Sequence, residues 1–202
     1  MFSLEDLLGQ QQGGDAVGQI SQMLGANQSM TSSAIQLALP MILSGLANNA
    51  STPQGAENLN TALEQDHSGG LLDNLMGYLG GGLSQPSETT RQTDGTGILG
   101  HIFGQKQSAV AQEVSQNSGL DIGQVAKLLI TLAPIVMAFL GKQKQQQGLG
   151  ADGLASLLQG QQQQMQSSGN PMMDMVTGFL DKDHDGSAMD DLASMAANYF
   201  RK

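Results

Sequence analysis

The sequence predicts an all-α protein in which two helical repeat units pack together, with an EF-hand-like loop and a helix at the C-terminal end. Three observations predict this fold class. The 202 residues include only five Phe, two Tyr and no Trp, so the core must be built from aliphatic side chains and Met, which favours close-packed helices over sheets. Similar segments recur at an offset of about 95 residues, which indicates an internal duplication. Aspartates spaced as in a calcium-binding loop lie near residue 185.

The duplication is visible in segments that recur in the same order. Single matches could arise by chance in a chain rich in Gly, Leu and Gln, but several at nearly constant offset argue for a repeat. The matching pairs are residues 7–10 with 102–105, 25–42 with 119–136, and 55–59 with 150–154.

Each unit begins with two helical segments. A short amphipathic segment comes first, at residues 4–9 in one unit and 98–104 in the other. A second helix follows, at 16–24 and at 109–117. Each second helix stops before a glycine, Gly25 or Gly119, in the position of a C-cap.

A long apolar helix comes next in each unit. Asn27 and Asp121 are placed as N-caps, and the helices extend to about residues 48 and 142. Pro40 and Pro134 occupy equivalent positions inside them, where each removes one hydrogen bond and predicts a bend. The alternative is that each proline splits its helix into two short ones. A further short helix is predicted to begin at Gly55 and at Gly150.

Low-complexity stretches suggest the domain boundaries. The first repeat covers 1–80, a Gly/Ser/Thr-rich linker covers 81–96, the second repeat covers 97–164, and a tail covers 165–202. Glutamine runs at 143–147 and 161–164 either extend their helices or lack fixed structure, and we favour frayed helix.

The tail contains the strongest chemical signal in the chain. Residues 181–192 place aspartates at positions 1, 3 and 5 of a loop and a glycine at position 6, as the front half of an EF-hand does. Carboxylates so close together repel one another unless a cation lies among them. We therefore expect Ca²⁺ as cofactor, with these metal ligands: Asp181, Asp183, Asp185, the backbone carbonyl of Ser187, and Asp190 or Asp191 to close the shell.

The loop also departs from the full motif. Position 12, normally a bidentate Glu, is Leu192. An alternative interpretation needs no metal, because Ser187 and Asp190 are spaced like a capping-box variant that opens a last helix. Residues 64–75 echo the loop with eroded ligands, and we expect this copy to bind metal weakly or not at all.

Charge and composition narrow the function classes. The net charge of −10, with eight Lys and Arg, argues against nucleic-acid binding and against attraction to anionic membranes. The N-terminal residues lack the features of a signal peptide, and the longest apolar run, 128–140, is too short to span a bilayer. We expect a cytoplasmic protein without a membrane span, although export by a signal-less route stays open. The absence of cysteine removes disulfides and thiolate chemistry.

Taken together, these motifs resemble a known family. The resemblance rests on Ala38-Leu39-Pro40, Gly55-Ala56, Leu132-Ala133-Pro134, Gly150-Ala151 and the loop at 183–192. They are similar to the bacterial domain-of-unknown-function family 937, to which YidB-like proteins are related. The resemblance implies a bacterial, all-helical protein and carries over no catalytic residues.

Two functional hypotheses follow. No phosphate-binding loop, nucleophile elbow or zinc-protease motif is present, so we expect no enzyme. The first hypothesis is a calcium-binding interaction protein of unknown biological role, whose tail is ordered by the metal. The second is a structural or self-associating protein, in which the aspartate loops are turns and caps and the partner is an unknown protein or a second copy.

Overall fold

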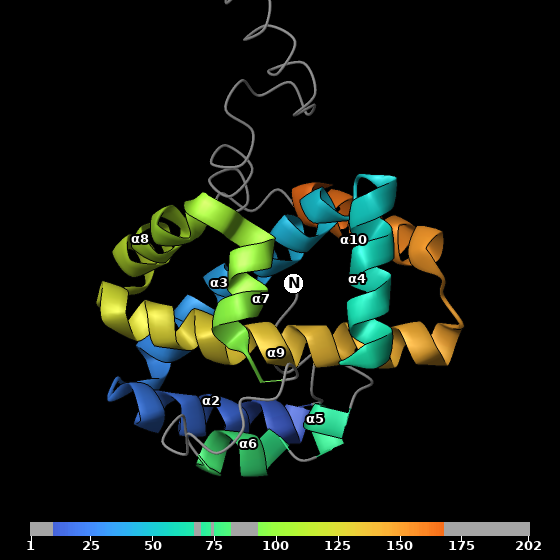
Figure 1. Ribbon diagram of the computed structural model, residues 1–202. Helices are drawn as coiled ribbons and strands as arrows, with labels where there is room; N and C mark the ends of the chain where they lie inside the picture. Colours follow the sequence, from blue (N-terminus) through green and yellow to red (C-terminus); the bar gives the residue numbers. More distant parts are fainter. Residues whose placement is uncertain (1–9, 67–69, 74, 82–92, 168–202) are drawn as a thin grey trace, which may run out of the picture. The chain divides into compact units, whose positions relative to one another are not determined.

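Helices supply all the regular secondary structure in the part of the chain that the structure describes. The computed structural model describes residues 10–66, 70–73, 75–81 and 93–167 (Figure 1). The elements are α2 (Gln10–Leu24), α3 (Gln28–Asn49), α4 (Pro53–Gln65), α5 (Gly70–Asp73), α6 (Leu75–Gly81), α7 (Gly95–Phe103), η1 (Gly104–Lys106), α8 (Gln107–Ser118), α9 (Ile122–Gln147) and α10 (Ala151–Ser167). The prediction of an all-α fold is confirmed for these residues.

The chain divides into two units, residues 1–162 and 163–202. Within the first unit, α3 and α9 form the centre, because α9 packs against α2, α3, α4, α5, α7 and α8. Figure 1 shows α7 and α4 crossing α9. Fully buried side chains on the two central helices include Leu39, Ile42, Leu132 and Ile135. Each such side chain contributes roughly 1.5–3 kcal/mol on burial, so this pair supplies the main part of the hydrophobic core.

The predicted caps of the central helices are confirmed. Asn27 precedes α3, and its side-chain oxygen accepts from the Met30 backbone N–H at 2.8 Å. Asp121 precedes α9 and forms a full capping box with Gln124, in which each side chain bonds the other's backbone N–H. Gly25 and Gly119, which follow α2 and α8, have φ of 64° and 78°. Left-handed backbone of this kind favours glycine.

Both central helices continue through their prolines, so the alternative of two short helices at each site is wrong. α3 contains Pro40 and α9 contains Pro134. Proline has no backbone N–H, so Pro134 gives no donor to the carbonyl of Ile130 four residues earlier. Gly95, the first residue of α7, packs on this carbonyl, and a Cβ added there would collide with the oxygen. The carbonyl that Pro134 leaves without its helical hydrogen bond is therefore the one on which Gly95 of α7 packs.

Long-range hydrogen bonds join the helices of the unit. The Gln124 side chain donates to the Leu24 carbonyl at 3.1 Å, across 100 residues of sequence. The Gln162 side chain donates to Ser44 Oγ at 3.3 Å. Both glutamine runs lie in helices, 143–147 in α9 and 161–164 in α10, as favoured from the sequence.

The length and composition of α3 and α9 also meet the criteria for a membrane span. Their mean hydropathies are 1.4 and 1.8, and 78% and 61% of the respective apolar windows is buried inside the protein. Core helices of a globular unit meet the same criteria. The prediction that the apolar run 128–140 is a buried helix is confirmed by Leu128, Leu132 and Leu140, which are buried in α9.

The remaining sequence predictions concern the two amphipathic segments, the tail and the linker. The first amphipathic segment, 4–9, and the tail with its loop at 181–192 lie outside the described residues. The second amphipathic segment, 98–104, lies in α7 and η1. α7 begins at Gly95, inside the stretch predicted as linker, and Asp94 caps it by accepting from the Gly97 N–H at 2.9 Å.

Candidate functional site

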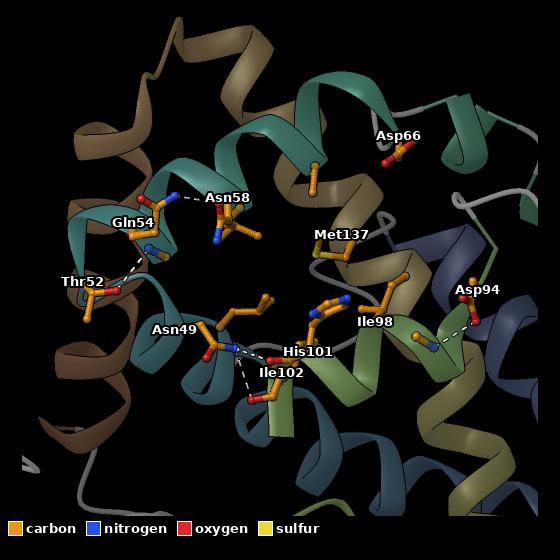
Figure 2. A pocket seen from close by; sticks show the side chains of 15 residues that line it. Asn49, Thr52, Gln54, Asn58, Asp66, Asp94, Ile98, His101, Ile102 and Met137 are labelled. Atoms are coloured by element: carbon orange, nitrogen blue, oxygen red, sulfur yellow. Dashed lines mark hydrogen bonds between the residues drawn. The ribbon is translucent and has the colours of Figure 1, made fainter. Parts of the chain in front are cut away.

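A cleft opens between α4 and α7, above the end of α3 and the middle of α9 (Figure 2). Its volume is about 840 Å³. This α4–α7 cleft is lined by fifteen residues from four helices and the segments that flank them. Because the lining comes from distant parts of the sequence, the cleft exists only once the helices have packed.

The floor of the cleft is apolar. Leu46 of α3, Leu59 of α4, Ile102 of α7 and Met137 of α9 all line it and are buried by their neighbours. Ala62 and Ile98 are half-buried and continue this surface up the two walls. The apolar area that these six side chains still expose favours an apolar group of a ligand, because contact removes that area and the ligand's own surface from water.

One end of the cleft is rich in side-chain amides. Gln54 and Asn58 lie one turn apart on α4, and the Gln54 amide donates to the Asn58 oxygen at 3.1 Å. Thr52 caps α4 by accepting from the Gly55 N–H at 3.1 Å. Figure 2 shows these side chains together, on the opposite side of the cleft from Asp66 and Asp94. Amides combine donors and acceptors, so this end can bond neutral polar groups.

Asn49 holds the cleft together at the same end. Its side-chain amide donates to the backbone carbonyls of His101 at 2.8 Å and Ile102 at 3.2 Å (Figure 2). These are among the last carbonyls of α7, which have no partner within a helix. The backbone of Asn49 is also approached closely by α4, since a Cβ added at Gly55 would collide with the Asn49 carbonyl oxygen. Asn49 thus fixes α3, α4 and α7 at one point.

The other end of the cleft carries two carboxylates. Asp66 is the C-cap residue of α4 and Asp94 is the N-cap residue of α7. Because α4 and α7 run in opposite directions along the cleft, the two aspartates lie at the same end (Figure 2). No lysine or arginine occurs among the lining residues, and His101 is the one histidine there. This end therefore presents net negative charge to a ligand.

An ion pair fastens the α4 wall to α9. Lys144 of α9 donates to Glu64 of α4, with side-chain exposures of 10% for Lys144 and 58% for Glu64. The hydrogen bond from Lys144, together with its positive charge, lowers the pKa of the Glu64 carboxyl below the ordinary value. The nearby Lys142–Asp73 pair is longer, at 3.7 Å, and both partners are exposed. Glu64 and Lys144 thus form the tighter electrostatic link between these helices.

The predicted metal ligands are not among the residues that the structure describes. Asp181, Asp183, Asp185, Ser187, Asp190 and Asp191 all lie outside the described residues. In the echo of the loop, Glu64 is engaged by Lys144 and Asp73 by Lys142. Across the described ranges, no three metal-ligating side chains come together. The echo therefore retains carboxylates, but two of them, Glu64 and Asp73, form ion pairs with lysines.

Sequence reasoning missed the cleft residues. The stretch Asp94-Gly95-Thr96-Gly97 carried a local signal, since aspartate before glycine and threonine is a common N-cap pattern. Asn49 gave no signal, because its partner His101 is 52 residues away.

Comparison with known proteins gives one match. A family model described as a bacterial protein of unknown function, DUF937, matches residues 6–143. No curated protein and no solved structure shows a significant match. Every residue that lines the cleft falls inside the matched span, and the aspartate loop at 181–192 falls beyond it.

Proposed function

The chain belongs to the DUF937 family of bacterial proteins of unknown function, and we propose that it is a non-enzymatic binding protein whose α4–α7 cleft holds an apolar group of a ligand. The observation that carries this proposal is the contrast between the buried apolar floor of Leu46, Leu59 and Met137 and the polar rim. Ligand-binding clefts of about 300–1,000 Å³ commonly combine such a floor with a few polar groups that orient the ligand.

A binding role fits the chemistry of the lining better than a catalytic one. The lining holds no serine, cysteine or lysine, and the Thr52 hydroxyl is engaged as a helix cap. Asp94 and Asn49 are likewise engaged, one at each end of α7. Side chains that hold helix ends support the shape of a cleft. Asp66 and His101 are the lining groups left to exchange a proton with a substrate, and no nucleophilic side chain accompanies them in the lining.

The arrangement of caps supports an origin by duplication. Asn27 and Asp121, Gly25 and Gly119, and Pro40 and Pro134 serve the same purposes in α2–α3 and in α8–α9. We read the two halves as repeat units packed together, with α3 and α9 as the equivalent central helices. In this interpretation both repeat units contribute to the cleft, because α4 belongs to the first repeat and α7 to the second.

A binding test can use a methyl group of the protein as the sensor. Met137 lies on the cleft floor, whereas Met41 is buried in α3 away from the cleft. In the full chain with ¹³C-labelled Met methyl groups, acetyl-leucine amide is expected to shift the Met137 resonance saturably and leave Met41 unchanged. The substitution Ala62→Phe places a ring in the part of the cleft that Ala62 lines and is expected to weaken or remove the shift.

The control for Ala62→Phe adds the same ring elsewhere on the same helix. Gln65→Phe is suitable, because Gln65 is exposed on α4 and does not line the cleft. This variant should bind as the parent chain does. An unmoved Met137 resonance in the parent chain, or an equal shift in Ala62→Phe, would contradict a binding cleft.

A second candidate function is calcium binding by the tail. It is supported by the alternate spacing of Asp181, Asp183 and Asp185 before a glycine, which suits an oxygen-rich cation site. Calcium bound only by the folded tail would stabilise it by mass action. A calorimetric titration with Ca²⁺, with Mg²⁺ as control, tests this. The double variant Asp183→Asn, Asp185→Asn should abolish the heat, and binding that survives it would show that these ligands are wrong.

A further inference from the structure

We infer that the occupant of the α4–α7 cleft is a peptide segment that presents one large apolar side chain next to a lysine or arginine. This inference rests on the proposed function, and it adds the class of ligand. It is carried by the order of chemical groups along the cleft, with amides at one end, an apolar floor in the middle and carboxylates at the other end (Figure 2).

The acidic end selects for positive charge. Asp66 and Asp94 face the same end from the two walls, with no lysine or arginine in the lining to balance them. One oxygen of Asp94 accepts from the Gly97 N–H, and the carboxylate keeps further acceptor capacity for a ligand. The C-terminus of α4 and the N-terminus of α7 meet at this end, and their opposite partial charges offset each other, so the two carboxylates set the sign of the potential. A cationic side chain meets complementary charge here, and an acidic one meets repulsion.

The amide end suits a peptide backbone. Gln54 and Asn58 already bond each other through one donor and one acceptor. Each amide group still offers a donor or an acceptor, which are the two groups that a peptide unit presents. A small apolar cation would satisfy the floor and the carboxylates but would leave these amides facing water alone.

The dimensions of the cleft agree with a short segment. Its volume of about 840 Å³ lies in the upper part of the range for sites that bury a drug-sized ligand. Leu46, Leu59, Ile102 and Met137 supply the apolar side chains of the floor. One large side chain such as Leu fills this surface, and the flanking residues of the peptide extend to the two polar ends.

Two peptides that differ in one charge provide the test. The probes are acetyl-Ala-Leu-Lys-Ala-amide and acetyl-Ala-Leu-Glu-Ala-amide, titrated into the full chain while the Met137 methyl resonance is followed. We expect the lysine peptide to bind about two- to fivefold more tightly, which is the range for exposed charge pairs. Added salt should reduce this preference, since surface charges are screened.

Variants locate the preference. Asp66→Asn and Asp94→Asn each remove one charge, and Asn is as good an N-cap as Asp. Each variant is expected to reduce the difference in affinity between the lysine peptide and the glutamate peptide. Asp121→Asn is the matched control, because Asp121 is also an N-cap aspartate and lies outside the cleft lining. It should leave the preference unchanged.

The outcomes separate the two proposals. Equal binding of both peptides, or tighter binding of the glutamate peptide, overturns the charge inference while the apolar cleft stands. If neither peptide moves the Met137 resonance, the binding cleft itself is wrong and the inference fails with it. A preference that survives both Asp66→Asn and Asp94→Asn also overturns the assignment of the acidic end.

Discussion

The first residue of α7, Gly95, packs directly on the backbone carbonyl of Ile130 in α9, at a distance that leaves no room for a Cβ. Pro134 explains why this carbonyl is available, because it lacks the N–H that would otherwise bond Ile130. Cα–H···O contacts of this kind recur where helices cross closely. The proline in α9 and the glycine in α7 are therefore two parts of one packing solution, and α7 in turn forms one wall of the cleft.

Replacing Gly95 by Ala should destabilise the protein. The added methyl group must displace backbone, and overpacking of this kind costs about 1–3 kcal/mol. Gly100→Ala is the matched control in the same helix, because a Cβ at Gly100 meets nothing within 4 Å. Alanine is the better helix former, so this control should be neutral or stabilising by up to about 1 kcal/mol. Chemical denaturation of both variants measures the difference, and equal stabilities would show that α7 does not depend on the close approach.

Replacing Asn49 by Ala should loosen the C-terminal end of α7. The variant loses both side-chain hydrogen bonds to the carbonyls of His101 and Ile102. Loss of such bonds costs about 1 kcal/mol each in typical proteins. Amide hydrogen exchange should therefore become faster in α7 and η1. Asn48→Ala serves as control, since Asn48 is the exposed preceding residue, and a similar loss in that variant would contradict a specific role for Asn49.

Replacing Glu64 by Gln should destabilise the contact between α4 and α9. The variant leaves the largely buried Lys144 ammonium without its carboxylate, and a buried charge that loses its partner is costly. Asp73→Asn breaks the exposed pair with Lys142 and should cost at most about 1 kcal/mol. Thermal unfolding compares the two. A larger loss for Asp73→Asn than for Glu64→Gln would show that burial of Lys144 does not matter.

The Glu64 carboxyl makes the stability of the protein depend on pH in the acidic range. Lys144 lowers the pKa of Glu64 below 4.5 in the folded protein. The unfolded chain therefore takes up this proton first as the pH falls. The stabilisation by Glu64 is full above the unfolded pKa and is lost as the pH falls through the folded one. Between pH 5 and the folded pKa, Glu64→Gln should lose less stability than the parent chain, as followed by denaturant midpoints (both limits are approximate).

The burial of Tyr78 predicts that the stability of the protein depends on pH in the alkaline range. Burial raises the pKa of its phenol from 10.0 to about 12, and its hydroxyl has no hydrogen-bond partner among the described residues. Unfolded chains ionise first as the pH rises past 10.0, so stability falls from there towards pH 12. Tyr78→Phe should weaken this fall and cost little at neutral pH, because it removes an unpaired polar group. The difference between absorbance titrations of the parent chain and of Tyr78→Phe separates this phenol from that of Tyr199, and a value near 10 for Tyr78 would contradict its burial.

The sequence predicted those features that depend on local chemistry. Gly25 and Gly119 need left-handed backbone, and Asn27 and Asp121 bond N–H groups only three residues away, so a few adjacent residues suffice to recognise them. The cleft depends instead on Asn49 meeting His101 and on α4 lying opposite α7. No local pattern specifies those distances, so the site was not found from the sequence. The early start of α7 at Gly95 was missed for the same reason, since glycine there is explained by Ile130 and not by helix propensity.

The hydrogen bond from Gln124 to Leu24 spans 100 residues of chain, and this separation has a consequence for synthesis on the ribosome. A chain lengthens by roughly 5–20 residues per second, so α3 emerges about 5–20 s before α9, the helix that covers it. During that interval α2 is already present to pack on α3, but the part of the α3 surface that α9 covers has no native partner, and such surfaces attract chaperones or promote aggregation. Because α9 is synthesised late, the order of translation determines how long the α3 surface that α9 covers stays exposed.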